Sequence, residues 1–280
     1  MHQKLLKISL VGKTNAGKST LLNKIIGETV SIINKKINTT QELIKGIINI
    51  SNIQIIFYDT PGLNILKHKD KLHKQLRVNL WQAIEESDII LYILDSKKIH
   101  FNELEEHLNQ LNKKIVFVFN KIDLIEKDKL LPIIKKLDKN FKIKSFFNIS
   151  AKYNLGINNL LDYLKKFSKE SKWLFLEDQI SNKDDIFITN ECTRNAILTY
   201  LHQELPYNIN IVNQYYKHLK NGDLKIKQKL IINNLRYRKI ILGKKGEKIK
   251  MIREFSQNQI SKILNCKTHL YLEVIRDNAN

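Results

Sequence analysis

The sequence predicts an α/β domain with a doubly wound, mostly parallel sheet, followed by a smaller α+β domain. Two observations carry this prediction. Through about residue 170, short apolar runs alternate with longer helical patterns, and beyond it the alternation stops. A chain of 280 residues is also long enough for two domains that each bury a core. We therefore predict a first domain at residues 1–170, a linker at 171–183 and a second domain at 184–276.

The first domain contains six predicted strands with predicted helices between them. Several of these strands are apolar almost throughout, as expected where both faces of a parallel sheet are covered. The strands are predicted at residues 5–11, 44–50, 53–58, 88–94, 114–119 and 143–149. The helices are predicted at residues 18–26, 75–86, 102–112, 128–137 and 156–167.

The second domain has a different order of elements. The linker before it shows no clear hydrophobic period. A helix is predicted at about 184–202, strands at 207–215 and 225–233, a helix at 246–264 and a last strand at 269–275. The order helix, strand, strand, helix, strand is typical of an α+β domain.

The charge of the chain points to a polyanionic partner. The sequence has 48 Lys and Arg against 28 Asp and Glu, a net charge of +20. Such a surplus attracts nucleic acid or an anionic membrane surface, although a lysine-rich composition can also spread solvated lysines over the whole surface. The distribution decides better than the total, because residues 217–253 alone hold 13 basic and two acidic side chains. This basic patch is the candidate contact surface.

Cysteine usage and hydropathy predict where the protein works. Cys192 and Cys266 occur without a CxxC pair, which favours a reduced, cytosolic protein without structural disulfides. The first residues do not resemble a signal peptide, and no apolar run approaches the ~20 residues that span a bilayer. We therefore expect a cytoplasmic protein in which any membrane contact is peripheral.

A phosphate-binding loop lies between the first predicted strand and the first predicted helix. Residues 12–19 read GKTNAGKS and fit the pattern GxxxxGK followed by Ser or Thr. The glycines let backbone N–H groups surround phosphates, and the helix N-terminus adds positive potential. Lys18 is expected to reach the β- and γ-phosphates, and the Ser19 hydroxyl to ligate Mg²⁺. The nucleotide-binding residues predicted from this segment are Gly12, Asn15, Ala16, Gly17, Lys18, Ser19 and Thr20.

A second motif follows the third predicted strand. Residues 59–62 read DTPG, which places a carboxylate where it can hold Mg²⁺ and a glycine N–H where it can meet the γ-phosphate. Taken alone, this segment would be an ordinary Pro-Gly turn. Its position after the phosphate loop makes Asp59 and Gly62 candidate site residues.

Two further motifs predict guanine as the base. Residues 120–123 read NKID at the end of an apolar strand, and a carboxylate at Asp123 can accept from both N1–H and the exocyclic amine of guanine. Residues 150–152 read SAK after the last strand of this domain, where the Ala151 N–H can reach guanine O6 and the Lys152 stem can cover the base. The base-binding residues predicted from these two motifs are Asn120, Lys121, Asp123, Ser150, Ala151 and Lys152.

These four motifs, in this order, resemble those of the translation-factor-like GTPases over about 170 residues. The resemblance implies a P-loop NTPase fold that binds GTP and GDP with Mg²⁺ and hydrolyses GTP. It also implies a switch threonine on Mg²⁺ and the γ-phosphate, and of Thr39 and Thr40 we favour Thr40. The implied Mg²⁺ ligands are thus Ser19, Thr40 and Asp59.

Catalysis in this chain cannot follow the Ras-like pattern. Leu63 follows Gly62 where Ras-like enzymes have the Gln that orients the attacking water, so hydrolysis is expected to be slow without a partner. In some relatives an Asn at the place of Asn15 holds K⁺ against the phosphates. The alternative, a local side-chain-to-backbone bond that caps the loop, stays open. The expected catalytic residues are Asn15, Lys18, Thr40 and Gly62.

The basic patch contains a GxxG loop. Residues 243–246 read GKKG and open a predicted helix whose recurring isoleucines belong to the core. Such glycines allow a nucleic-acid backbone to approach closely, as in KH domains, while neighbouring lysines meet phosphates. A GxxG loop alone would more often be a plain turn. The predicted RNA-binding residues are Arg238, Gly243, Lys244, Lys245, Gly246 and Lys248.

The order of elements around this loop resembles a type II KH domain. A P-loop GTPase joined to one such domain resembles the Era family of GTPases over nearly the whole chain. That family implies binding near the 3′ end of 16S rRNA, assistance in assembly of the 30S ribosomal subunit, and loose association with the inner face of the cell membrane. We also expect a monomer.

Two alternatives stay open at this point. A related GTPase that serves tRNA modification would predict a partner-dependent catalytic cysteine near the C-terminus and an N-terminal folate-type domain, and neither is found in the sequence. A peripheral membrane GTPase whose lysines contact anionic lipid is compatible with the charge, but it leaves the GxxG loop unexplained.

Overall fold

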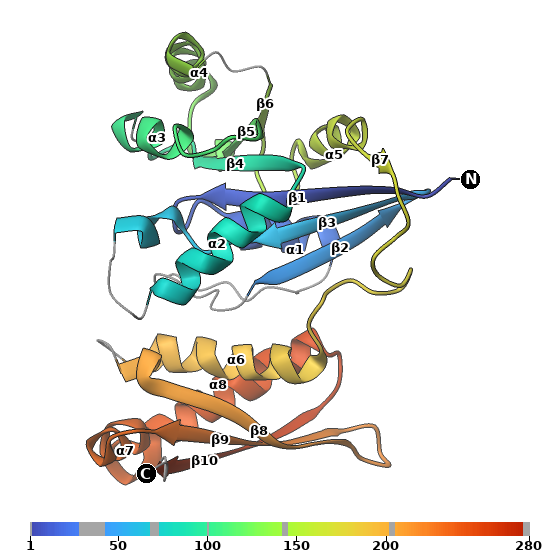
Figure 1. Ribbon diagram of the computed structural model, residues 1–280. Coiled ribbons are helices and arrows are strands. Elements are labelled where there is room, and N and C mark those ends of the chain that lie inside the picture. The colour runs from blue at the N-terminus through green and yellow to red at the C-terminus, as the bar shows by residue number, and fades with distance from the viewer. Residues whose placement is uncertain are drawn as a thin grey trace. The chain divides into compact units, whose positions relative to one another are not determined.

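The computed structural model divides the chain into two compact units, of which the first runs through Asn182 and the second begins at Lys183 (Figure 1). It describes residues 2–27, 43–67, 73–99, 101–141, 145–201 and 205–276. The predicted switch residues Thr39 and Thr40 lie outside these ranges.

The described part of the first unit is built on a seven-stranded sheet. Its strand order is β2-β3-β1-β4-β5-β6, with the short β7 antiparallel to β1. β2 is antiparallel to β3, and the other pairs along the main path are parallel. The predicted mostly parallel, doubly wound sheet is therefore confirmed. The strands are β1 (Lys4–Gly12), β2 (Ile44–Ile50), β3 (Ile53–Asp59), β4 (Ile89–Asp95), β5 (Lys114–Asn120), β6 (Phe146–Asn148) and β7 (Lys169–Glu170).

Helices cover both faces of this sheet (Figure 1). On one face, α1 (Lys18–Ile26) and α5 (Ile157–Lys165) contribute buried leucines and isoleucines to a core with β1, β3 and β4. On the other face, α2 (Lys74–Glu86), α3 (Phe101–Leu108) and α4 (Lys127–Phe141) form a second core with β4 and β5. Burial on both faces explains why these strands are apolar almost throughout.

The carboxyl ends of the parallel strands meet at one edge of the sheet. β1, β3, β4 and β5 all end there, so the loops that follow them converge. At the end of β1, a Cβ on Gly12 would lie 2.3 Å from the carbonyl oxygen of Ile93 in β4. Only glycine therefore lets the phosphate loop leave the sheet so close to the neighbouring strand.

The segment that the sequence predicts as a linker is held against the first unit. Residues 171–182 run along the hairpin of β2 and β3, where Ile47 N donates to Ile180 O at 2.9 Å and Lys45 N donates to Asn182 Oδ1 at 2.8 Å. The lack of a hydrophobic period has a physical reason, since this segment is attached mainly by hydrogen bonds to an edge strand.

A buried glutamine anchors the middle of that segment. The Gln54 side chain in β3 accepts hydrogen bonds from Leu174 N at 2.9 Å and Phe175 N at 3.1 Å through Oε1. Its Nε2 donates to Phe175 O at 3.0 Å and to Asn49 Oδ1 at 3.1 Å. Gln54 is fully buried, so every polar atom of its amide is used inside the protein.

The second unit is a three-stranded sheet with helices packed on one face. The strand order is β10-β9-β8, with β9 parallel to β10 and antiparallel to β8. α6 and α8 lie side by side over this sheet and enclose a core that includes Ala196, Leu230 and Ile252 (Figure 1). The elements are α6 (Asp185–Tyr200), β8 (Ile209–His218), β9 (Leu224–Ile232), α7 (Leu235–Leu242), α8 (Glu247–Ile263) and β10 (Thr268–Arg276).

The predicted order of elements was wrong in one place, because it omitted α7. Asn234 caps this helix, and its Oδ1 accepts from Arg236 N at 2.9 Å. Ile241 is the buried side chain of the helix, so α7 lacks the apolar stripe that predicts an amphipathic helix. Arg236, Arg238 and Lys239 of this helix appear in the sequence only as part of the basic patch.

None of the helices in the described ranges is both long enough and apolar enough to cross a membrane.

Replacing Gln54 by Leu is expected to lower the free energy of unfolding by about 2 kcal/mol, because the N–H groups of Leu174 and Phe175 lose their acceptor. Urea unfolding measures this change. Gln82→Leu on the exposed face of α2 removes a surface hydrogen bond to Glu86 and should change stability by less than about 0.5 kcal/mol. Equal effects of the two substitutions would show that Gln54 does not hold the segment.

Candidate functional site

The phosphate loop is organised around the buried ammonium group of Lys18. Its Nζ donates to the carbonyl oxygens of Gly12 at 3.1 Å and Lys13 at 3.0 Å, so the side chain folds back inside the loop. Burial lowers the pKa of Lys18 to about 8, although the negative charge of Asp59 opposes this shift. The loop therefore holds a cation at its centre, at the start of α1, where the first N–H groups of a helix attract anions.

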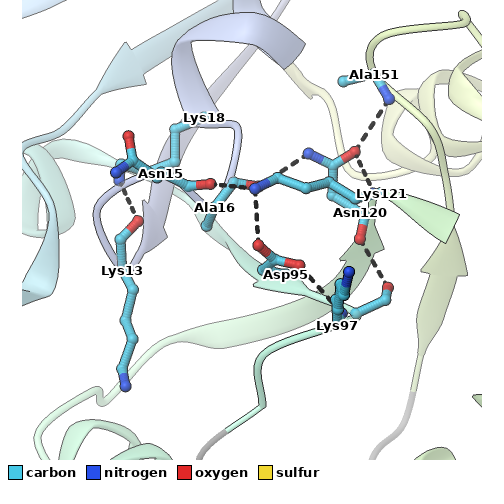
Figure 2. A network of polar contacts seen from close by, with 10 residues as sticks. Lys13, Asn15, Ala16, Lys18, Asp95, Lys97, Asn120, Lys121 and Ala151 are labelled. Carbon is cyan, nitrogen blue, oxygen red and sulfur yellow. Dashed lines mark hydrogen bonds and ion pairs between the residues drawn. The ribbon is translucent and has the colours of Figure 1, made fainter. Parts of the chain in front are cut away.

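Asn120 joins three of the predicted motifs (Figure 2). Its Nδ2 donates to Ala16 O at 2.9 Å, and its Oδ1 accepts from Lys121 N at 2.8 Å and Ala151 N at 3.0 Å. A Cβ on Gly17 would lie 2.2 Å from this Nδ2, so glycine is required for the close approach. The Ala151 N–H predicted for guanine O6 is thus engaged with Asn120 in this structure.

Lys121 ties the same loops together from a second direction. Its backbone is left-handed, with φ 65°, and its Nζ donates to Asn15 O at 2.6 Å and to Asp95 Oδ2 at 2.7 Å. Sequence reasoning missed Asp95. It could have been found, because Asp95 ends β4 just as Asp59 ends β3 and Asn120 ends β5.

A pocket of about 250 Å³ lies beside these residues, where a base is expected. Ser150 Oγ donates to Asp123 Oδ1 at 2.5 Å, which fixes the carboxylate at the pocket wall. The structure thus brings together the residues predicted to bind guanine. The lining residues are Gly17, Thr20, Asn120, Lys121, Asp123, Leu124, Ala151 and Lys152.

The two described residues predicted to bind Mg²⁺ lie next to each other. Ser19 Oγ donates to Asp59 Oδ2 at 2.6 Å, and Asp59 is fully buried. Hydroxyl and carboxylate oxygens are the hard ligands that Mg²⁺ prefers, so this pair fits the ion. The third predicted ligand, Thr40, lies outside the described residues.

The segment after β3 packs directly on the phosphate loop. A Cβ on Gly62 would lie 2.2 Å from Thr14 Oγ1 and 2.6 Å from Thr14 N, so glycine permits the contact. Asn64, which sequence reasoning also missed, accepts from Thr14 N at 3.1 Å through Oδ1. Leu63 is buried in the core on the α2 side and does not offer a polar group to water.

The GxxG loop connects α7 to α8. Gly243, Lys245 and Gly246 all have positive φ, at 71°, 51° and 81°. A Cβ on Gly243 would lie 2.7 Å from Lys248 Cβ, whereas a Cβ on Gly246 would meet open space. Arg238, Lys244 and Lys245 are exposed and Lys248 is half-buried. The loop therefore presents cations and an open backbone at the start of α8, as an anion-binding turn requires.

Comparison with protein-family models identifies both units. The model described as a 50S ribosome-binding GTPase matches residues 7–121, and a KH domain model matches residues 204–280. The predicted KH domain is thus confirmed. Helix α7, which the sequence analysis omitted, and the GxxG loop and α8 that follow it all lie within residues 204–280 of the second match.

Curated relatives and solved structures extend the likeness to the whole chain. GTPase Era of Rickettsia prowazekii is 40% identical over 276 residues, which cover 97% of this chain and 92% of the relative. GTPase Era of Ehrlichia canis is 35% identical over 269 residues, which cover 95% and 90%.

Two solved structures superpose on the chain with a TM-score of 0.84. One is Era in complex with MgGDPNP and nucleotides 1506–1542 of 16S ribosomal RNA, which is 31% identical and matches over 99% of this chain and 95% of that one. The other is an Aquifex aeolicus Era variant bound to GDP·AlF4⁻, which is 30% identical and matches over 98% and 95%. With this identity over almost the full length of both chains, the protein belongs to the Era family of GTPases, which hydrolyse GTP.

Proposed function

We propose that this GTPase binds the 3′ end of 16S rRNA through its second unit and assists assembly of the 30S subunit in the cytoplasm, under control of the nucleotide in its first unit. The observation that carries the proposal is the GxxG loop, with its exposed lysines and open glycine, at the start of α8. A relative with a TM-score of 0.84 was crystallised with nucleotides 1506–1542 of 16S rRNA, which supports the choice of RNA.

In the first unit, the phosphates of GTP or GDP bind the N–H groups of residues 13–19 and the Lys18 ammonium. Because Lys18 loses hydration on burial, two loop carbonyls and the nucleotide phosphates replace its water. Ser19 and Asp59 are the described residues that would hold Mg²⁺. When bound, this ion supplies positive charge to the phosphate oxygens.

Guanine selection rests on Asp123, whose carboxylate accepts two hydrogen bonds that adenine cannot offer in the same arrangement. Ser150 orients that carboxylate, and Asn120 holds the two loops that flank it. The Lys121 and Lys152 stems cover the base in the same pocket.

Hydrolysis in this chain relies on groups other than a glutamine. Leu63 is buried away from the loop, so water is oriented by backbone groups, a cation or the ribosomal partner. Asn15 is exposed in the middle of the phosphate loop with φ 64°. We propose that the Asn15 side chain would hold K⁺, which would supply positive charge to the phosphates during hydrolysis.

Replacing Asp123 by Asn should lower GTP affinity by about 100-fold or more, since two charge-assisted hydrogen bonds are lost. Binding of xanthosine triphosphate should improve, because the amide can donate to the carbonyl that replaces the guanine amine. Titration with fluorescent nucleotides measures both. Asp128→Asn, the same change at an exposed position of α4, is the control. An unchanged GTP affinity in Asp123→Asn would refute the base assignment.

Replacing both Lys244 and Lys245 by Asp should lower RNA affinity by more than about tenfold, because two negative charges then face phosphates. GTP binding should stay intact. Lys135→Asp with Lys136→Asp, at two exposed positions of α4, makes the same charge change in the first unit and should leave RNA affinity within about twofold. RNA binding that is equal in the two pairs would contradict the KH assignment of the loop.

Crosslinking in cells and binding to lipid vesicles distinguish the proposed function from the two alternatives, tRNA modification and membrane binding. Crosslinks of the unmodified chain should map to the 3′ end of 16S rRNA, and crosslinks that map to tRNA would support a role in tRNA modification instead. If the loop substitutions abolish binding to anionic vesicles but spare RNA, the basic patch serves a membrane.

Hydrolysis should be faster in K⁺ than in Na⁺ at equal ionic strength if the Asn15 side chain holds the cation. Because alanine is strained at φ 64°, Asn15→Gly removes the side chain with less distortion than Asn15→Ala, and either should abolish the difference between the salts. Single-turnover rates of phosphate release measure it. Equal rates of the unmodified protein in the two salts would leave backbone groups and ribosomal partners as the source of catalysis.

A further inference from the structure

The face of the three-stranded sheet opposite α6 and α8 carries a regular array of lysines and tyrosines. Along β9 the buried side chains of Leu224, Ile226, Gln228 and Leu230 alternate with lysines that point to the other face. We call this other face the outer face. It carries Val212, Tyr215, Lys217, Lys225, Lys227, Lys229, Tyr271 and Glu273, with His269 beside Lys225 and with Asn210, Ile231 and Ile275 at the far end of the strands.

A β-bulge places Tyr215 on the outer face. Val212 pairs with Lys229 and Asn213 with Gln228, but the register then shifts and Tyr215 pairs with Lys227. Because side chains alternate between faces, Tyr215 without the extra residue would point towards α6 and α8. Bulges often re-aim a side chain next to a functional site. The result is a tyrosine that is 41% exposed beside the central strand.

The second tyrosine lies at the same level on the other side of β9. Tyr271 in β10 pairs with Lys227 and is 53% exposed. Two strand spacings separate the two tyrosine backbones, about 10 Å. Lys225 Nζ lies 5.9 Å from the centre of the Tyr215 ring and 5.7 Å from that of Tyr271. The two rings therefore flank a cation on an open surface.

The charge of the outer face is strongly one-sided. Lys217, Lys225, Lys227 and Lys229 outnumber the two acids on this side of the sheet. Glu273 is paired with Lys227 at 3.0 Å, and Asp223 at the edge contacts His269 at 2.7 Å and Lys267 at 3.9 Å. Lysines at alternate positions of one strand and at the facing position of its neighbour repel one another. A surface selected for solubility alone would be served better by mixed charges.

We propose that the outer face is a second contact surface for single-stranded RNA, with bases stacked on Tyr215 and Tyr271 and phosphates near Lys217, Lys225 and Lys229. Aromatic platforms beside basic side chains are the combination that binds unpaired strands, because each base offers a face for stacking. In a double helix the bases are stacked on one another, so their faces could not stack on the tyrosine rings. A lipid surface is a poorer match, since it would favour well-exposed aliphatic side chains that insert. Ile231 and Ile275 are only partly exposed and lie beyond Lys229, whereas the tyrosines lie among lysines.

The proposal rests on the proposed RNA-binding function of the second unit. A GxxG loop binds about four nucleotides, so the additional nucleotides of a longer RNA can contact the outer face. Dependence of affinity on RNA length therefore separates the two surfaces.

The test uses the full chain and two unstructured single-stranded RNAs of about five and about 20 nucleotides. Tyr215→Ala with Tyr271→Ala should weaken binding of the long RNA by about tenfold and leave the short RNA within about twofold. Tyr215→Phe with Tyr271→Phe keeps the rings and should retain the affinity of the unmodified chain. The melting temperature checks that each variant is folded.

The lysines are tested by the salt dependence of long-RNA binding. Lys225→Gln with Lys229→Gln should reduce the slope of log affinity against log salt by about 1.4, which corresponds to two lost contacts on a single strand. Lys135→Gln with Lys136→Gln in the first unit is the control and should leave the slope unchanged.

Unchanged long-RNA affinity in the alanine pair, or equal loss in the phenylalanine pair, would overturn the proposal. Loss of binding to anionic vesicles without loss of RNA binding would overturn it in favour of a membrane. If the alanine pair weakens long-RNA binding while Lys244→Asp with Lys245→Asp does not, the outer face stands and the GxxG assignment fails.

Discussion

The amide of Asn120 is the interaction on which the nucleotide site depends. One buried side chain donates to the phosphate loop and accepts from the loops that follow β5 and β6. These three segments come from distant parts of the chain. Each backbone group left without its partner would cost about 1–3 kcal/mol, so the three loops form as one unit. Base recognition and phosphate binding are therefore linked through the protein itself.

The parallel sheet makes this arrangement possible, because it delivers the loops to a single edge. Gly12, Gly17 and Gly62 then remove the side chains that would keep them apart. The charged groups at this edge are also arranged in opposite-sign pairs. Lys18 and Asp59 are buried close together, and Lys121 is paired with Asp95. In the second unit, Gly246 of the GxxG loop leaves the backbone open, whereas Gly243 permits close packing on Lys248.

Sequence reasoning found what local chemistry determines. The strands of the first unit were predicted to within about a residue for β1 to β5, because burial on both faces leaves a continuous apolar run. Three of the motifs in the first unit begin where a strand ends, since Gly12, Asp59 and Asn120 are the last residues of β1, β3 and β5. Asp95, Asn64 and the anchoring role of Gln54 were missed, since their importance comes from partners up to 121 residues away in the sequence. α7 and the bulge in β8 were missed because neither produces a period of its own.

Lys245 stands out among the loop residues because its backbone has φ 51°, a conformation that glycine or asparagine adopts at lower cost. Selection for stability alone would replace it with one of those residues. A lysine at this position keeps its charge at the expense of about 1 kcal/mol of folding free energy. Directed evolution for thermal stability, without selection for RNA binding, should therefore replace Lys245 early. This single position would then show that folding stability and RNA binding favour different residues.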